Sequence, residues 1–217
     1  MACSELRLAV LVSGSGSTMV NLQRRIESGD LPARIAVVVS SRRKALGLRR
    51  AEEMGLTARA LPRRPFRGED GFDAEAYSAA LAELLEPFDP ELIAMGGFMT
   101  RLAAPVLDRW PVLNVHPALL PMFGGEGFYG QRVHEAVLEA GVKVTGATVH
   151  FADERYDRGP IVIQEPVAVR EDDTPDTLAE RVQQAERRIY PRAIELIARG
   201  RVRVEGKRAR ILEEPRR

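Results

Sequence analysis

Residues 6–18 read LRLAVLVSGSGST, an apolar run followed directly by serine, glycine and threonine. Leu6–Val12 is rich in β-formers and is bounded by glycine, so it predicts a buried strand that enters a tight loop. A helix from about Met19 to Ser28 is predicted next, and Gly29 ends it. A strand, a glycine loop and a helix in this order are typical of α/β folds.

The same alternation continues through the first half of the chain. Strands are predicted at Arg34–Ser40, Thr57–Leu61, Glu91–Met95 and Val112–Val115, and helices at Lys44–Met54 and Asp73–Leu85. The Pro62–Gly71 segment, rich in proline, arginine and glycine, is predicted to be a surface loop. Strands separated by helices imply right-handed crossovers and a mostly parallel, doubly wound sheet.

The pattern changes after residue 140. Lys143–Phe151 and Ile161–Val169 are β-rich runs joined by a short polar loop, which favours antiparallel pairing. Pro175 opens an amphipathic helix that extends to about Arg199, and a small hairpin is predicted in the charged tail after it. The sequence therefore predicts one domain, residues 1–217, with a Rossmann-like α/β fold and antiparallel strands in its C-terminal part.

Composition restricts the class of partner. The 217 residues are 45% hydrophobic and 29% charged, which is ordinary for a globular protein. The 32 basic and 31 acidic residues give a formal net charge of +1, without the basic excess that nucleic acid or an anionic membrane favours. A small-molecule partner is therefore predicted, with no nucleic acid and no membrane.

Cysteine usage and the N-terminus bear on the compartment. Cys3 is the only cysteine, so neither an intrachain disulfide nor a four-cysteine metal site can form within the chain. The N-terminus lacks the basic region and long apolar core of a signal peptide, and no apolar stretch reaches about 18 residues. A cytoplasmic protein is predicted.

The Ser13–Thr18 loop, SGSGST, is a candidate anion site. Its glycines let the backbone approach a ligand, and the following helix directs amide groups toward an anion. Met19 stands where a dinucleotide fingerprint needs its third glycine, and no Lys-Ser/Thr pair follows as in a P-loop. A monophosphate fits best, and an ordinary glycine-rich turn is an equally good interpretation of this motif alone.

The segment Asn114-Val115-His116-Pro117 ends a predicted strand. His116 can exchange protons near neutral pH, and Asn114 lies on the same side of an extended chain, where its amide can donate to an oxyanion. The alternative is a structural histidine and a turn-forming asparagine.

Two further histidines and one further loop complete the candidates. His134 lies in a predicted helix, where solvent exposure or helix packing is the default role. His150 ends a predicted strand before a loop with three acids (Asp153, Glu154 and Asp157), and the residues alone do not choose among these acids. No two histidines have metal-ligand spacing. The Gly96–Leu102 loop, GGFMTRL, suits either a flat ring ligand or a buried turn.

Five segments, in chain order, carry a family resemblance: VLVSGSGST, GGFMTRL, LNVHPALLP, TVHFADERYDRGPIVIQ and VQQAERRIYPRAI. Together they resemble the phosphoribosylglycinamide formyltransferases, folate-dependent enzymes of de novo purine synthesis, from about Leu6 to Ile211. The pattern N-x-H-P-[SA]-L-L-P followed by H-x(6)-D-x-G-P is specific to folate-dependent formyltransferases and their hydrolase relatives.

The resemblance implies a reaction and catalytic residues. A formyl group would pass from 10-formyltetrahydrofolate, a co-substrate, to the glycinamide amine of 5'-phosphoribosylglycinamide through a tetrahedral intermediate. Asn114 would steady the oxyanion, His116 would move protons or stabilise the intermediate, and Asp157 would orient and support His116. His150 would lie behind these groups, away from the substrates.

The resemblance also implies binding residues. Gly16, Ser17 and Thr18 would hold the acceptor's phosphate, and Gln183 and Glu186 would contact the rest of the acceptor. The folate would lie against Met99, Thr100, Arg101, Leu102, Asn114, Ala152, Asp153 and Glu154. No metal is expected, and the protein is expected to be a monomer or a homodimer.

The chain departs from the family pattern at several positions. Thr18 stands where many members have asparagine, Thr100 where an arginine is usual, and Ala74 where an arginine often precedes E-A-Y. The glycine-rich Met122–Gly130 segment replaces a more regular sequence, and it is predicted to be mobile.

Three other functions are compatible with parts of this sequence pattern, and each makes a different prediction. Formyltetrahydrofolate hydrolases resemble this core but carry an extra N-terminal domain, for which a first strand at Leu6 leaves no room. Methionyl-tRNA formyltransferases add a C-terminal nucleic-acid-binding domain, which a nearly neutral chain ending soon after its core does not favour. A non-catalytic sugar-phosphate binding module would have no need for Asn114, His116 and Asp157 together.

Overall fold

The computed structural model describes residues 5–69 and 71–213, and Cys3 lies outside them. The chain divides into two compact units, the first ending at Leu113 and the second beginning at Asn114. The expectation that residues 1–217 form one domain stays a prediction.

Four parallel strands form the sheet of the first unit. They are β1 (Leu6–Val12), β2 (Ala33–Ser40), β3 (Ala58–Ala60) and β6 (Leu92–Met95), in the order β3-β2-β1-β6. β1 is fully buried from Leu8 to Val12. A strand without an exposed face needs cover on both sides, which explains its continuous apolar run.

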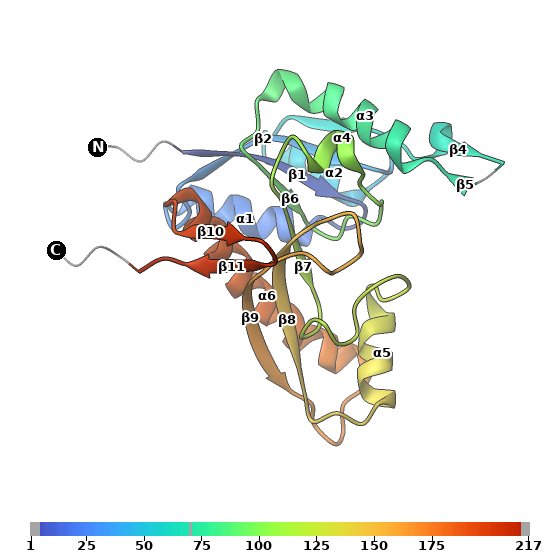
Figure 1. Cartoon of the computed structure of the whole chain (residues 1–217), viewed down its shortest axis with the longest axis vertical. Helices are drawn as coiled ribbons and strands as arrows, with labels where there is room; N and C mark the ends of the chain where they lie inside the picture. Colours follow the sequence, from blue (N-terminus) through green and yellow to red (C-terminus); the bar gives the residue numbers. More distant parts are fainter. Residues whose placement is uncertain (1–4, 70, 214–217) are drawn as a thin grey trace. The chain divides into compact units, whose positions relative to one another are not determined.

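Helices cover both sides of this sheet. They are α1 (Ser17–Glu27), α2 (Leu46–Glu53), α3 (Ala74–Leu85) and the short α4 (Ala104–Leu107), which the sequence did not predict. α1 contacts α2 and α3 contacts α4, and Figure 1 shows α1 and α3 on opposite sides of the strands. Because β2 and β6 flank β1, the strand order reverses at β1, and the loops after β1 and β6 lie where α/β sheets bind ligands.

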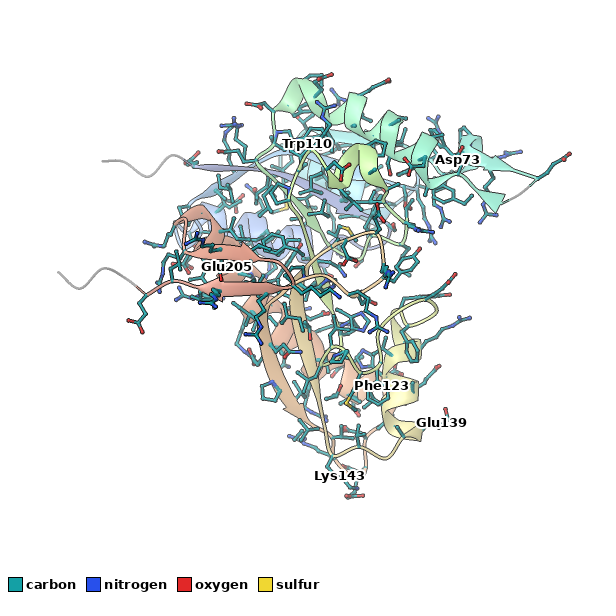
Figure 2. The ribbon with its side chains drawn as sticks, viewed as in Figure 1. Asp73, Trp110, Phe123, Glu139, Lys143 and Glu205 are labelled. Carbon is teal, nitrogen blue, oxygen red and sulfur yellow. The ribbon has the colours of Figure 1, made fainter. Side chains whose placement is uncertain are left out.

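The prediction that Pro62–Gly71 is an irregular surface loop is wrong in part, because some of these residues form regular secondary structure. A 3₁₀ turn at Arg64–Phe66 leads into β4 (Arg67–Gly68), which pairs antiparallel with β5 (Gly71–Phe72). The ring of Phe66 packs edge-to-face on buried Tyr77 of α3, with ring centroids 5.2 Å apart. Asp73, labelled in Figure 2, caps α3 by accepting a 2.9 Å hydrogen bond from the amide of Ala76. Aromatic packing against α3 therefore folds this loop back.

The second unit contains the antiparallel part of the fold. Its elements are α5 (Gln131–Glu139), β8 (Val144–Phe151), β9 (Ile161–Ala168), α6 (Pro175–Ala198), β10 (Val202–Glu205) and β11 (Arg208–Ile211). β7 (Val112–His116) begins in the first unit and ends in the second. β8 pairs antiparallel with β9, α6 packs on both strands, and β10 and β11 form a hairpin with Glu205 near its turn (Figures 1 and 2). The predicted antiparallel pairing, long helix and tail hairpin are confirmed.

α6 begins where the sequence predicts. Thr174 and Thr177 cap each other's backbone amides, and Pro175 occupies the first helical position, where its missing N–H costs nothing. The α/β fold class, mostly parallel with antiparallel strands toward the C-terminus, is confirmed. Among the described residues, no helix is long and apolar enough to cross a membrane.

Candidate active site

The loop after β1 is built around the backbone of Gly16. This residue has a φ of 71°, and a Cβ added to it would lie 2.6 Å from the Cα of Gly47. Only glycine combines the left-handed conformation with this close approach. α1 starts at exposed Ser17, with no side-chain cap and no acidic residue in its first turn. Its first amide groups are therefore free of side-chain caps and suited to an anion.

The loop after β6 adjoins this candidate anion site within the first unit. A Cβ on Gly96 would lie 2.9 Å from the Cβ of Thr18, and the amide of Met99 donates a 2.9 Å hydrogen bond to the Ser13 hydroxyl. In this loop Met99 is 40% exposed and Arg101 is exposed, whereas Thr100 and Leu102 are buried. Of the predicted folate residues here, Met99 and Arg101 are the ones whose side chains a ligand can reach.

Four side chains meet in the second unit. Asn114 and His116 come from β7, His150 from the end of β8, and Asp157 from the following loop. The Asp157 carboxylate lies 3.5 Å from His116 Nδ1 and 3.5 Å from His150 Nε2. The Asn114 Nδ2 atom lies 3.2 Å from His150 Nε2.

The structure thus brings together the three predicted catalytic residues, Asn114, His116 and Asp157. It also places His150 in direct contact with two of them. Of the three candidate acids in the loop after β8, Asp157 is the one in contact with the histidines, whereas Asp153 and Glu154 are exposed.

Backbone groups fix the cluster. The carbonyl of Phe123 accepts from His116 Nε2 at 2.8 Å, and the carbonyl of Phe151 accepts from His150 Nδ1 at 2.9 Å. The amide of Gly125 donates to Asp157 Oδ2 at 2.9 Å. Because a carbonyl can only accept, His116 carries hydrogen on Nε2 and His150 carries hydrogen on Nδ1.

Burial and charge set the protonation states. Burial lowers the pKa of His116 below its ordinary value, and the nearby Asp157 carboxylate and the Phe123 carbonyl only partly offset this effect. Burial alone would raise the pKa of Asp157, but its contacts with His150 and His116 and the hydrogen bond from the Gly125 amide outweigh this effect, so this pKa is lowered. The resting cluster therefore combines a neutral His116 with an ionised Asp157.

Two residues of the cluster have unusual backbone conformations. Phe123 has a φ of 52° and Asp157 a φ of 57°. Left-handed conformations of this kind cost about 1–3 kcal/mol each in residues other than glycine, and they persist where the surroundings enforce them. The Phe123 carbonyl that holds His116 and the backbone that carries the Asp157 carboxylate are therefore maintained against local preference.

His134 lies near this cluster but has a different environment. It sits on α5, is 4% exposed, and its Nδ1 has no hydrogen-bond partner among the described residues. Burial and the neighbouring His116 lower its pKa, so it is neutral. The default role of helix packing, rather than solvent exposure, agrees with this burial.

The predicted acceptor residues Gln183 and Glu186 lie on α6, three positions apart and so on one face. Gln183 is exposed and Glu186 is half-buried. Burial of its carboxyl group raises the pKa of Glu186 to about 7, against the weaker effect of Arg187. In the loop after β8, Ala152 is half-buried. Among the described residues, no group of three or more His, Cys, Asp or Glu side chains is arranged so that it could hold a metal ion.

Residues 6–194 match the family model described as formyl transferase. The chain belongs to the formyl transferase family. The trifunctional purine biosynthetic protein adenosine-3 of Bos taurus is 42% identical over 210 residues, which cover 94% of this chain. The chain spans only 19% of that relative's length.

Solved structures of formyl transferases agree with this assignment. The glycinamide ribonucleotide transformylase 1 of Symbiobacterium toebii superposes with a TM-score of 0.87 at 39% identity, covering 97% of this chain and 95% of that one. A formyltetrahydrofolate deformylase from Pseudomonas syringae reaches a TM-score of 0.84 at 23% identity, covering 98% of this chain and 67% of that one. At such low identity the second likeness shows the fold alone.

The cluster of Asn114, His116, His150 and Asp157 also includes two backbone groups that sequence reasoning missed. The Phe123 carbonyl and the Gly125 amide belong to the backbone, so no residue type in the sequence indicates their role. The glycine-rich stretch around them was the available signal, because it allows the chain to present backbone groups. Thr148 and Gln164, which hydrogen-bond to the backbone of Ala118 and Leu120 just after His116, lie in predicted β-rich runs that gave no sign of this contact.

Proposed function

We propose that the chain transfers the formyl group of 10-formyltetrahydrofolate to the amine of 5'-phosphoribosylglycinamide, a step of de novo purine biosynthesis. The observation that carries this proposal is the contact of Asp157 with both His116 and His150, beside Asn114, in a member of the formyl transferase family. The named transformylase relative supports the choice of acceptor.

His116 is suited to accept a proton as the amine attacks. The ring starts neutral because burial lowers its pKa. Once protonated, it has an acceptor at each nitrogen, namely the Phe123 carbonyl at Nε2 and the Asp157 carboxylate at Nδ1. The site thus stabilises the imidazolium at the stage when the amine loses its proton, and positioned general bases contribute about 10²–10⁴-fold in rate. The tetrahedral intermediate then collapses: the bond between the formyl carbon and N10 of the folate breaks, and the proton leaves with tetrahydrofolate.

Asn114 is suited to stabilise the oxyanion of the tetrahedral intermediate. An amide nitrogen can only donate, so Asn114 Nδ2 donates to His150 Nε2 at 3.2 Å, while His150 Nδ1 donates to the Phe151 carbonyl. This contact sets the orientation of the amide group, whose second N–H can donate to the former formyl oxygen. Removal of one such donor typically costs about 10²–10³-fold in turnover.

The substrates are proposed to bind where the family resemblance implies. The backbone of Gly16, Ser17 and Thr18 at the start of α1 would hold the acceptor's phosphate, and Gln183 and Glu186 would contact the rest of the acceptor. The folate is proposed to lie against the following residues: Met99, Thr100, Arg101, Leu102, Asn114, Ala152, Asp153 and Glu154. A cytoplasmic location and a monomeric or homodimeric state remain predictions.

A spectrophotometric assay tests the function. A 10-formyl folate analogue is incubated with the protein, with and without glycinamide ribonucleotide, and release of the deformylated folate is followed. Release that requires the ribonucleotide, with formation of the formylated ribonucleotide, is the expected result. Equal release in both samples would replace the proposal with formyltetrahydrofolate hydrolysis, and no release in either would leave a sugar-phosphate binding module.

A further inference from the structure

The hydroxyl group of Thr148 connects β8 to the segment that follows His116, and all of its hydrogen-bonding capacity is used. The Thr148 Oγ1 atom donates to the carbonyl of Ala118 at 2.6 Å and accepts from the amide of Leu120 at 3.0 Å. It also accepts from Gln164 Nε2 at 3.0 Å. A hydroxyl has one hydrogen and two lone pairs, so these three bonds use its full capacity.

Gln164 completes this arrangement from the neighbouring strand. It lies directly opposite Thr148 in the β8–β9 ladder, and its Nε2 also donates to the carbonyl of Leu120 at 2.9 Å. The two side chains thus hold both polar backbone groups of Leu120 and the carbonyl of Ala118. We refer to Thr148 and Gln164, with these bonds, as the β8–β9 clamp.

The side chains of the clamped segment pack between the clamp and the catalytic cluster. Leu119, within the clamped segment, fills the space over Gly146 of β8, where an added Cβ would lie 2.7 Å from its side chain. The side chain of Leu120 closes off the space above Gly124, and an added Cβ there would also lie 3.2 Å from the Cβ of Asp157. Clamping Leu120 therefore sets the position of the loop at Gly124.

That loop supplies the two backbone groups that hold the catalytic pair. Phe123 presents its carbonyl to His116, and Gly125 presents its amide to Asp157. Phe123 and Asp157 are both in the left-handed region, so their conformations depend on support from their surroundings. The amide of Met122 donates to the carbonyl of Leu119 at 3.1 Å, which connects the clamped segment to the loop at Phe123.

We propose that Thr148 and Gln164 are positioning residues, which set the His116–Asp157 geometry through the segment Ala118–Leu120 and the loop Phe123–Gly125. Neither residue touches a substrate in the proposed reaction. This inference rests on the proposed function for its kinetic effect, but its structural effect is independent of any substrate.

Matched substitutions on one strand test the proposal. Thr148→Val keeps the shape of the side chain and removes the clamping hydroxyl, whereas Thr148→Ser keeps the hydroxyl. Thr145→Val is the control, because Thr145 lies on the opposite face of β8, is 1% exposed, and its Oγ1 has no partner among the described residues. Gln164→Met is the second variant, which removes the amide and leaves the hydroxyl of Thr148 in place.

The expected kinetic result is a fall in kcat of about 10- to 100-fold for Thr148→Val and Gln164→Met, as for small misplacements of catalytic groups. KM for both substrates should stay within about twofold, because no binding contact is removed. Thr148→Ser should recover most of the lost turnover, and Thr145→Val should match the parent protein. A folded Thr148→Val variant with unchanged kcat would overturn the proposal.

An NMR readout separates this inference from the proposed function. The Gly125 amide proton, which donates to Asp157, should shift upfield in Thr148→Val and Gln164→Met and stay in place in Thr145→Val. If the parent protein shows no formyl transfer, the proposed function fails and this shift still tests the clamp. An unmoved Gly125 resonance in both clamp variants would overturn the proposal whatever the activity.

Discussion

The loop Ser13–Thr18 and the cluster around Asp157 are built in opposite ways. The loop is one continuous stretch whose useful groups are backbone amides and whose decisive residue, Gly16, has no side chain. The cluster gathers charged and polar side chains from β7, the end of β8 and the loop after it. Added side-chain atoms should therefore disrupt the loop Ser13–Thr18, whereas loss of charge should impair the cluster around Asp157.

Loss of charge at Asp157 should have the largest effect. Asp157→Asn keeps the size of the side chain and tolerates the left-handed backbone, but it removes the carboxylate that faces both histidines. We expect kcat to fall about 10³-fold. Steady-state kinetics measures this, with thermal unfolding as the control for folding. A kcat within about tenfold of the parent would remove Asp157 from the mechanism.

An added methyl group at Gly16 should have the second-largest effect. Gly16→Ala places a Cβ against Gly47 in a residue with a φ of 71°, so we expect a loss of about 2–3 kcal/mol of unfolding free energy. Gly14→Ala is the matched control, because no atom lies within 4 Å of the Cβ position there. Urea denaturation compares the two. Equal stabilities would show that the loop is not built around a bare backbone.

A negative charge at Ser17 should affect binding alone. Ser17→Asp puts a carboxylate at the start of α1, where it repels the acceptor's phosphate, so its KM should rise about tenfold. The carboxylate also suits the helix dipole, so the melting temperature should not fall. Glycinamide riboside, which lacks the phosphate, is the control substrate. An equal KM increase for the riboside would place the phosphate elsewhere.

The mildest effect should come from a change of pH, which acts on kcat through His116 of the cluster. His116 must be neutral to take a proton, and burial holds its pKa below the ordinary histidine value of 6.5. Turnover should therefore persist below pH 6.5 and fall, about tenfold per pH unit, only as the pH drops through the lowered pKa. A pH profile of kcat at saturating substrates measures this. An acid limb centred above pH 6.5 would contradict the assignment.

Features that depend on a continuous stretch of sequence were predicted, and features that depend on contacts between distant residues were not. The β1 bounds Leu6–Val12 agree with the prediction because a fully buried strand needs an unbroken apolar run. The β4–β5 pair was missed because it depends on the packing of Phe66 and Phe72 against Tyr77, a contact that short-range patterns do not encode.

The cluster was harder to predict than the loop. Asp153, Glu154 and Asp157 share one short segment, and the residue types alone could not choose among them. The family resemblance selected Asp157, and the backbone turn at this residue carries its carboxylate to the histidines. The contact of His150 with Asp157 and the roles of Phe123 and Gly125 depend on chain geometry, which the sequence does not display.

The left-handed backbone at Asp157 has a consequence for attempts to redesign this protein. Among residues with side chains, aspartate and asparagine adopt that conformation most readily, because their short polar groups can bond locally. A longer acid such as glutamate would combine backbone strain with a displaced carboxylate. Asp157→Asn is therefore the substitution that changes the charge at this position while keeping both the backbone conformation and the size of the side chain, and new chemistry is better sought at Asn114 or His116.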